Sequence, residues 1–389
     1  MGFRRGLMRI VILDTYYPPF LLDHYARRPE LRRASYAEQH RALMERAFGT
    51  SDAYSRNLRL LGHDATEVVV NCVPAQRAWA GERGRSGVAA ALAALPERGR
   101  IGRVVGSLSG ALHRVALDQI GSFEPDVVYL QDIRFHTPKQ IEDFRGANRR
   151  FVAGQTASRE PTDAQLAALD LVLTSFPHYV ERFERKGVRS AYLRLGFDGE
   201  ILDRIDPRVD RAVDVVFVGG LDRRVHGEGV ALLETVCAAL GDAAAVYGYG
   251  ASSLPADSSV LACYRGEAWG LEMYEALSSG RIALNRHIVT AEGFANNMRL
   301  FEATGVGTAL LTESAPNLAQ LFEPGVEVAT YERADDVIGT IEHLLADRDS
   351  LARLASAGQR RTLTEHTFGV RMAELVNLLE LHLAAGRLR

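Results

Sequence analysis

The chain has 389 residues, of which 47% are hydrophobic and 24% charged, and its formal net charge at pH 7 is −3. This length exceeds one ordinary hydrophobic core and predicts two domains of roughly 150–200 residues each. The slightly acidic balance lacks the overall positive field that nucleic acid binding needs, so nucleic acid is excluded as a partner.

The beginning of the chain and its cysteines indicate a cytoplasmic protein. The apolar run in MGFRRGLMRIVIL is too short for a signal peptide and continues into a loop. No stretch holds about 18 uninterrupted apolar residues, which excludes an integral membrane segment. Cys72, Cys237 and Cys263 lie far apart and match no metal spacing. Free buried thiols in a reducing compartment are the simplest account of them.

The first half of the chain predicts alternating strands and helices. The buried strand RIVIL (9–13) is followed by Asp14 and by a loop with the breaker pair Pro18-Pro19. Helical spacing over 36–61 leads to a strand at 65–70, and an elaboration rich in Ala, Arg and Gly covers 75–118. The remaining strands are expected at 127–130, followed by Gln131-Asp132, and at 151–153, 171–174 and 191–193. This pattern predicts an α/β domain with a parallel sheet.

The second half repeats this architecture after a polar, breaker-rich stretch at 198–212. Its first strand, 213–218, runs into Gly219-Gly220. Further strands are expected at 244–248, 281–285, 308–312 and 327–331, and helices at 230–240, 272–279, 296–307, 316–322, 335–346 and 371–383. We therefore predict an N-terminal domain over 1–205 and a C-terminal domain over 206–368, followed by a terminal segment, 369–389.

Ligands of doubly wound sheets bind at the carboxyl ends of the strands, so residues just after strands are the candidates. Gly219 and Gly220 would let a backbone approach a phosphate, with Arg223 close behind, although a tight turn explains them equally well. Tyr264 and Arg265 follow the short run 259–263 and would hold a planar base at a strand end, or form a plain loop. His287, two residues after a strand, is either functional or structural.

The stretch NNMRLFEATGVG (296–307) predicts one short helix that Asn296 or Asn297 caps. Arg299 and Glu302 are three residues apart and share a face of this helix. One interpretation is an ordinary intrahelical ion pair worth a few tenths of a kcal/mol. The other is a nucleotide site, in which the helix start and Arg299 bind a diphosphate and Glu302 accepts hydrogen bonds from two ribose hydroxyls.

Three segments of the second half resemble a known family: RIALNRH (281–287), EGFANNMRLFEATGVGTALLTE (292–313) and NLAQLFEPGVEVATY (317–331). They resemble the C-terminal donor domain of GT-B glycosyltransferases, closest to the CgeB-like, group 1-type branch. FGTSDAYSRNLRLLGHDATEVVVN (48–71) and LDLVLTSFPHYVERFERKGVRSAYLRLGFD (169–198) look like the same branch with less specific motifs.

The resemblance implies an α/β protein of two Rossmann-like doubly wound domains facing a central cleft. It also implies that the C-terminal helix of 369–389 crosses back onto the first domain. It implies that the second domain holds most of a nucleotide-sugar donor, with Glu302 on the ribose and Gly219 and Gly220 under the diphosphate. Arg299 or Arg223 would offset the charge of the leaving group in place of a metal. The expected donor is a UDP- or TDP-sugar, with no cofactor and no metal, and the expected acceptor is a small molecule or a polysaccharide.

One position departs from the family. Many retaining relatives carry two glutamates with seven residues between them, but the position eight before Glu302 is Phe294. The stereochemical outcome therefore stays open. An inverting enzyme needs a general base on the first domain. The candidates, all in or near predicted loops, are Asp14, Asp132 and Asp52, with His24 and His136 as weaker ones.

Three functions follow from this pattern. The first is a metal-independent glycosyltransferase of the hexosyl or a related class. The second is a nucleotide-sugar 2-epimerase, which resembles the same architecture and would isomerise its nucleotide sugar without an acceptor. The third is a non-catalytic nucleotide-sugar-binding protein, which the missing first glutamate keeps open. The sequence does not determine the oligomeric state.

Overall fold

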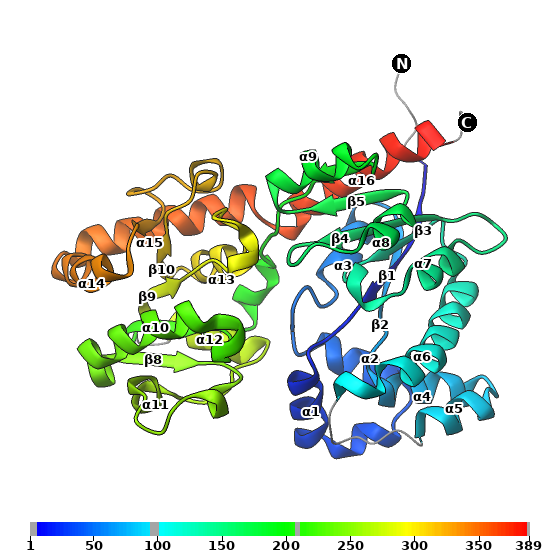
Figure 1. Cartoon of the computed structure of the whole chain (residues 1–389), viewed down its shortest axis with the longest axis horizontal. Helices are drawn as coiled ribbons and strands as arrows, with labels where there is room; N and C mark the ends of the chain where they lie inside the picture. The colour runs from blue at the N-terminus through cyan, green and yellow to red at the C-terminus, as the bar shows by residue number, and fades with distance from the viewer. Residues whose placement is uncertain (1–5, 94–100, 207–210, 387–389) are drawn as a thin grey trace. The chain divides into compact units, whose positions relative to one another are not determined.

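The computed structural model describes residues 6–93, 101–206 and 211–386. The chain forms two compact units (Figure 1): unit 1 contains Met1–Leu193 and Met372–Arg389, and unit 2 contains Arg194–Arg371. Part of the predicted elaboration (94–100) and part of the polar stretch between the halves (207–210) lie outside the described residues.

Unit 1 is built on a six-stranded sheet in the order β2-β1-β3-β4-β5-β6, and each neighbouring pair is parallel. The predicted parallel sheet is thus confirmed. Its central strands are buried along their whole length, which explains their nearly continuous apolar sequences. The strands are β1 (Arg9–Asp14), β2 (Asp64–Val69), β3 (Val127–Leu130), β4 (Phe151–Thr156), β5 (Leu171–Thr174) and β6 (Ser190–Tyr192).

The helices of unit 1 correct one expectation. Pro18 and Pro19, which we took as part of a loop, occupy the first positions of a helix, where a proline loses no intrahelical hydrogen bond. The helices are α1 (Pro18–Arg27), η1 (Pro29–Arg33), α2 (Tyr36–Met44), α3 (Ala53–Leu60), α4 (Val73–Glu82), α5 (Ser86–Ala93), α6 (Ile101–Phe123), η2 (Ile133–Phe135), α7 (Pro138–Arg145), α8 (Asp163–Ala167), α9 (Pro177–Arg185) and the C-terminal part of α16 (Phe368–Gly386).

Unit 2 contains a five-stranded parallel sheet in the order β11-β10-β9-β7-β8. Its strands are β7 (Val213–Val218), β8 (Ala244–Tyr247), β9 (Gly280–Asn285), β10 (Ala309–Glu313) and β11 (Ala329–Tyr331). Its longer helices are α10 (Arg223–Leu240), α11 (Ser259–Cys263), α12 (Leu271–Ser279), α13 (Arg299–Gly305), α14 (Val337–Ala346) and α15 (Arg348–Glu365).

Helices cover both faces of the unit 2 sheet, as in other doubly wound folds. One face buries Val215, Ile282 and Leu311 against apolar residues of α10, α11, α14 and the start of α15. α12 packs against β7 and α13 against β10. The 18-residue helix α15 was missed in the sequence, and the helix predicted at 316–322 is only the short 3-10 turn Leu318–Gln320.

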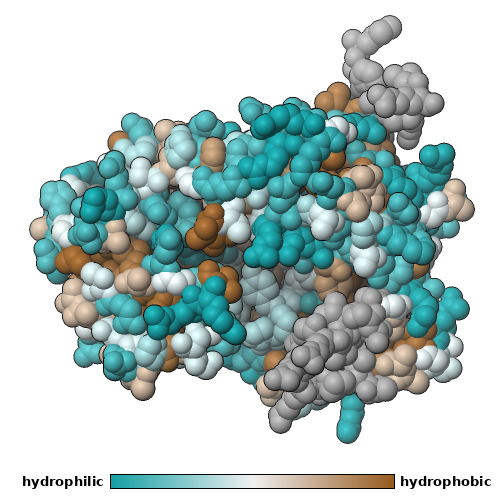
Figure 2. Space-filling model, in the orientation of Figure 1, coloured by the Kyte–Doolittle hydropathy of each residue, from teal (hydrophilic) through white to brown (hydrophobic). Residues whose placement is uncertain are grey.

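The face of the molecule drawn in Figure 2 is mostly polar. Figure 2 shows hydrophilic residues over most of the face drawn there, with apolar residues in small separate patches. Within the described ranges, no helix is both long enough and apolar enough to cross a membrane.

Candidate functional site

The strand order of unit 2 singles out one place on its sheet. β7 and β9 are neighbours, but the chain leaves β7 towards β8 on one side and β9 towards β10 on the other. Ligands of open α/β sheets bind at such a topological switch point, outside the carboxyl ends of the two strands. Gly219-Gly220 follow β7, and the loop from Arg286 to Met298 follows β9. The structure therefore brings two predicted motifs to one edge.

The loops after β7 and β8 run so close together that only glycine fits between them. Gly219 N donates to Tyr247 O at 3.0 Å, and Leu221 N donates to Tyr249 O at 2.8 Å. A Cβ on Gly248 would overlap the carbonyl oxygen of Gly219, and one on Gly219 would lie 2.7 Å from the Phe217 ring. The close packing of the two loops requires glycine at these positions. Because glycine has no side chain, the backbone of Gly219 and Gly220 is not covered by side chains of its own.

Arg223 is the first residue of α10, which begins seven residues earlier than the helix predicted at 230–240. Asp222 caps this helix by accepting a hydrogen bond from Arg224 N at 3.0 Å. The same carboxylate pairs with the Arg224 guanidinium at 2.6 Å, which holds the pKa of Asp222 at about 2. The Arg223 side chain is exposed, and it forms no ion pair with the residues that the structure describes.

The end of β9 carries a buried hydrogen-bond network. Asn285 Nδ2 donates to Thr312 Oγ1 at 2.9 Å, and Asn297 Nδ2 donates to Asn285 Oδ1 at 2.8 Å. Asn297 Oδ1 also accepts from Leu300 N at 3.3 Å, so Asn297 bonds to the first turn of α13 as expected of a cap, although the helix begins at Arg299. The network fixes the loop between β9 and α13.

His287 belongs to the same edge. Its backbone N–H donates to Glu313 Oε2 at 3.3 Å, and its Nε2 lies 3.4 Å from Thr312 Oγ1. Burial lowers the pKa of His287 to about 4, so the ring is neutral at physiological pH. Its Nδ1 is buried and has no hydrogen-bond partner among the described residues.

Arg299 and Glu302 form a buried ion pair at the start of α13. Arg299 Nη1 lies 2.7 Å from Glu302 Oε2, and the side chains are only 15% and 7% exposed. Burial raises the pKa of Glu302, and the charge of Arg299 opposes this rise. Arg299 Nε is buried without a hydrogen-bond partner among the described residues, as is Asn296 Nδ2 in the preceding loop. Such groups are rare, and a ligand is one of the few explanations for them.

Tyr264 and Arg265 lie beside the carboxyl end of β8, although no strand directly precedes them. The preceding run 259–263 is the helix α11 and not a strand, so these two residues do not follow a strand end. Arg265 N donates to Val246 O at 2.9 Å, beside β8. The Arg265 guanidinium lies 3.8 Å from Asp242, which precedes β8. Tyr264 Oη donates to Gly248 O at 2.9 Å, so Tyr264 supports the glycine loops.

Sequence reasoning missed two aromatic residues near the glycine loops. Tyr249 follows β8 between two glycines, and its ring stacks on Trp269 with the centroids 5.7 Å apart and an interplanar angle of 16°. His226 is the third ring, 6.5 Å from Tyr249, and it faces Gly220. The sequence GYG at 248–250, directly after a strand, was the available signal.

Unit 1 has its own switch point, between β1 and β3. Asp14 ends β1, and Asp132 lies in the loop after β3. Thr15 Oγ1 donates to Asp132 Oδ2 at 3.0 Å, while Thr15 N donates to Asp14 Oδ1 at 2.7 Å. Thr15 therefore joins the two predicted carboxylates. Burial raises the pKa of Asp14 to about 7, with smaller contributions from the charges of Asp132 and Glu67.

The other predicted bases are less suited to proton transfer near neutral pH. Burial lowers the pKa of His24 to about 4 and that of His136 to about 3. Asp52 pairs with Arg56 at 2.8 Å. No group of three or more His, Cys, Asp or Glu side chains within the described ranges is arranged to hold a metal ion.

Comparison with known proteins agrees with this architecture. Residues 223–377 match a family model described as glycosyl transferase-like. Sucrose-phosphate synthase from Thermosynechococcus elongatus superposes with a TM-score of 0.62 at 11% identity, covering 97% of this chain and 100% of that one. The Anabaena protein HepE in complex with UDP-glucose gives 0.56 at 14% identity, covering 96% and 99%.

The fold is GT-B. At these identities the solved structures establish the architecture of two Rossmann-like units and nothing finer. A putative UDP-N-acetylglucosamine 2-epimerase from Listeria monocytogenes is also similar to this GT-B chain, with a TM-score of 0.50 at 10% identity over 97% of each chain. No curated protein sequence matches it significantly. The CgeB-like branch stays a prediction.

Proposed function

We propose that this GT-B protein is a glycosyltransferase that moves a sugar from a nucleoside diphosphate sugar to a small-molecule or polysaccharide acceptor. The observation that carries the proposal is the buried Arg299–Glu302 pair, which lies at the switch-point edge of unit 2 with an unpartnered Arg299 donor. The glycosyl transferase-like match spans the same residues. The expected donor is a UDP- or TDP-sugar, and the reaction needs neither a metal nor a cofactor.

In this proposal unit 2 holds the donor. The carboxylate of Glu302 is an acceptor-only group with two oxygens, which suits two neighbouring ribose hydroxyls. The Gly219-Gly220 backbone has no side chain to keep a diphosphate at a distance. Arg299 supplies a fixed positive charge for the diphosphate that leaves when the sugar–phosphate bond breaks. Electrostatic stabilisation by Arg299 would thus replace a metal ion.

Unit 1 would hold the acceptor and activate it. A general base works best when its pKa lies near the working pH, and Asp14 meets this condition with a pKa of about 7. The Asp14 carboxylate takes the proton of the acceptor hydroxyl as the oxygen attacks the anomeric carbon. Asp132, joined to it through Thr15, adds negative charge beside it. This arrangement, with Phe294 in place of a first glutamate, favours an inverting reaction.

A thermal-shift panel of UDP, TDP, GDP and ADP, each with and without EDTA, tests the donor site. A ligand that binds only the folded state raises the unfolding midpoint by mass action. We expect UDP or TDP to raise it, EDTA to have no effect, and Glu302→Gln to abolish the shift. If no nucleotide shifts the midpoint at millimolar concentration, the assignment of Glu302 to a nucleotide site is wrong.

Incubation of the protein with UDP-N-acetylglucosamine alone separates transfer from epimerisation. If the protein is a 2-epimerase, proton NMR would show inversion at C2 of the sugar. The similarity to the Listeria protein is the reason to test this alternative. A transferase would give only slow release of UDP and a free sugar of one anomeric configuration. If a nucleotide raises the unfolding midpoint but no nucleotide sugar is turned over, with or without an acceptor, the protein is a non-catalytic nucleotide-sugar-binding protein.

A further inference from the structure

A second polar site lies in unit 1, in the segments inserted after the carboxyl ends of β1 and β2. It is a pocket of about 270 Å³ between η1, the start of α2 and α4. One water occupies roughly 30 Å³ in the liquid, so the pocket has room for a phosphate group or a small organic anion. Its polar lining consists of Arg32, Arg33, Ser35, Arg77 and Glu82.

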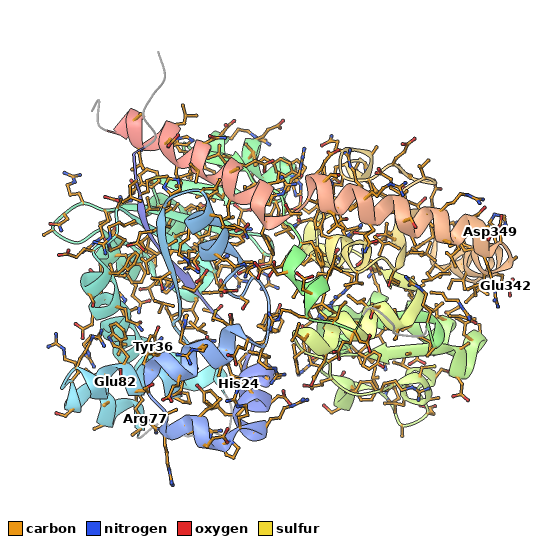
Figure 3. The ribbon with its side chains drawn as sticks, turned by 180° about the vertical axis from the view of Figure 1, so that it is seen from behind. His24, Tyr36, Arg77, Glu82, Glu342 and Asp349 are labelled. Carbon is orange, nitrogen blue, oxygen red and sulfur yellow. The ribbon has the colours of Figure 1, made fainter. Side chains whose placement is uncertain are left out.

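The charges of this lining do not balance. Three arginines and one glutamate line the pocket, and Glu82 is already engaged, because its Oε1 accepts a hydrogen bond from Tyr36 N at 2.6 Å. Neither Arg33 nor Arg77 forms an ion pair with a residue that the structure describes. Figure 3 shows Tyr36, Arg77 and Glu82 gathered at one end of the unit. The pocket therefore carries a net positive charge.

Nearby arginines show that this imbalance is local. Arg27 and Arg28 precede the pocket in the stretch RRPELRR (27–33). Arg27 Nε lies 2.7 Å from Asp23 Oδ1, and Arg28 Nε lies 3.4 Å from Glu30 Oε1. Acidic neighbours thus pair with the first two arginines of the stretch, whereas Arg33 has no such partner among the residues that the structure describes.

Two of the three arginine side chains, those of Arg32 and Arg77, contact packed elements. Arg77 Nη2 donates to Arg32 O at 3.2 Å, which ties α4 to η1. The Arg32 guanidinium lies 5.0 Å from the centre of the Tyr25 ring, and Tyr25 Oη donates to the buried Gln39 at 2.7 Å. Ser35 Oγ is engaged with Glu38 at 2.7 Å, so Arg33 and Arg77 are the expected donors to a ligand. A preorganised site loses little side-chain entropy when it binds.

We propose that this pocket binds the phosphate or carboxylate group of a small anionic molecule, independently of the nucleotide-sugar site. Guanidinium groups present paired N–H donors that match both anions, and such charge-assisted hydrogen bonds are about twice as strong as neutral ones. The anion is either the phosphate group of a phosphorylated sugar or free phosphate, because the arginines would bind the phosphate oxygens of both in the same way.

Isothermal titration calorimetry of the full chain with inorganic phosphate at constant ionic strength tests the site. Arg33→Gln and Arg77→Gln each remove one pocket charge, and Arg41→Gln removes one from an exposed position of α2 outside the pocket. We expect the pocket variants to weaken phosphate binding about tenfold or more and the control to leave it within about twofold. Equal weakening in all three variants, or no binding by the wild-type protein at millimolar phosphate, would overturn the proposal.

Further titrations identify the source of the anion and guard against misfolding. If glucose 6-phosphate binds more tightly than phosphate and glucose does not bind, the ligand is a phosphorylated sugar. If glucose 6-phosphate and phosphate bind equally, the ligand is free phosphate. Titration with succinate tests whether the pocket binds a carboxylate. Arg77→Lys keeps the charge and should regain part of the affinity. Arg33 is exposed, so Arg33→Gln should keep the wild-type unfolding midpoint. Glu302→Gln should bind phosphate normally even if no nucleotide binds.

Discussion

Arg299 Nη1 and Glu302 Oε2 lie 2.7 Å apart within α13, and both side chains are almost fully buried. Two charges in such a position are costly to desolvate, and either one alone is costlier still. The ion pair therefore does not show that it stabilises the fold. It is better explained by a binding site that needs a positive charge and a hydrogen-bond acceptor in fixed positions.

This relationship predicts that a single substitution costs more stability than a double substitution that removes both charges. Glu302→Ala should lower the free energy of unfolding by about 3 kcal/mol, because it leaves Arg299 buried without a counter-charge. The double variant Arg299→Met, Glu302→Leu should regain most of this stability. Urea unfolding measures both. Neither variant should bind UDP or TDP, and a stable double variant that keeps nucleotide affinity would show that the pair has no part in binding.

A buried carboxylate in unit 1 makes stability depend on pH. Glu67 is 4% exposed and accepts hydrogen bonds from Ser55 N at 2.7 Å and Ser55 Oγ at 2.5 Å. Burial nevertheless raises its pKa to about 7. The folded state therefore binds a proton more tightly than the unfolded state, so the stability that this proton contributes is present below about pH 4.5 and is lost as the pH rises through about 7.

We expect the free energy of unfolding to fall by up to about 3 kcal/mol from this group between pH 4.5 and 7.5. Glu67→Gln should remove that part of the slope, because an amide does not titrate. Asp14, whose pKa burial also raises, adds a slope of the same sign. The buried His24, His136 and His287, whose pKa values are lowered, add slopes of the opposite sign. Urea unfolding at each pH gives the comparison. A variant with the slope of the wild-type protein would assign the pH dependence to other groups.

Asp14 should control the pH dependence of turnover. If its carboxylate is the base, kcat rises as the pH approaches about 7 and is level above it. Asp14→Asn should lower kcat by about 10²–10⁴ and abolish this rise. Thr15→Val is the matched control, since it breaks the bond to Asp132 but keeps the Thr15 N–H on Asp14. If Asp14→Asn keeps the pH profile of the wild-type protein, another group is the general base.

Two glycines of unit 2 should differ in their tolerance of alanine. The Cβ of Gly248→Ala would meet the backbone carbonyl of Gly219, which cannot move without shifting the loop. The Cβ of Gly220→Ala would meet the side chain of His226, which can rotate away. We expect Gly248→Ala to cost about 1–3 kcal/mol of unfolding free energy and Gly220→Ala clearly less. Similar losses in the two variants would mean that the loops are not locked by backbone contact.

The sequence predicted the fold well because local patterns determine it. Strands such as β1 (RIVILD), β3 (VVYL) and β7 (VDVVFV) are rich in apolar, β-branched residues, and the parallel sheets followed from the alternation of such runs with helical spacing. The sequence also placed Asp14, Asp132, Gly219 and the β9 loop at strand ends, which the structure brings to two switch points. What it could not give was the strand order, which depends on contacts far apart in the chain.

The errors have local physical causes. Pro18-Pro19 were taken for a loop because proline breaks helices, but at the first helical position it does not. The run 259–263 is apolar and too short for periodicity to distinguish a helix from a strand, so the element before Tyr264 and Arg265 was taken for a strand although it is a helix. The Arg32–Arg33–Arg77 pocket was invisible, since Arg77 reaches it from another helix.

The chain has two tryptophans, and they stand in different units. Trp269 stacks on Tyr249 beside the glycine loops, and Trp79 contacts Tyr36, whose N–H binds the pocket residue Glu82. Each candidate site thus has its own intrinsic fluorophore. Trp79→Phe and Trp269→Phe would give two single-emitter proteins in which the optical response to a nucleotide and the response to a small anion can be recorded separately, without any attached dye.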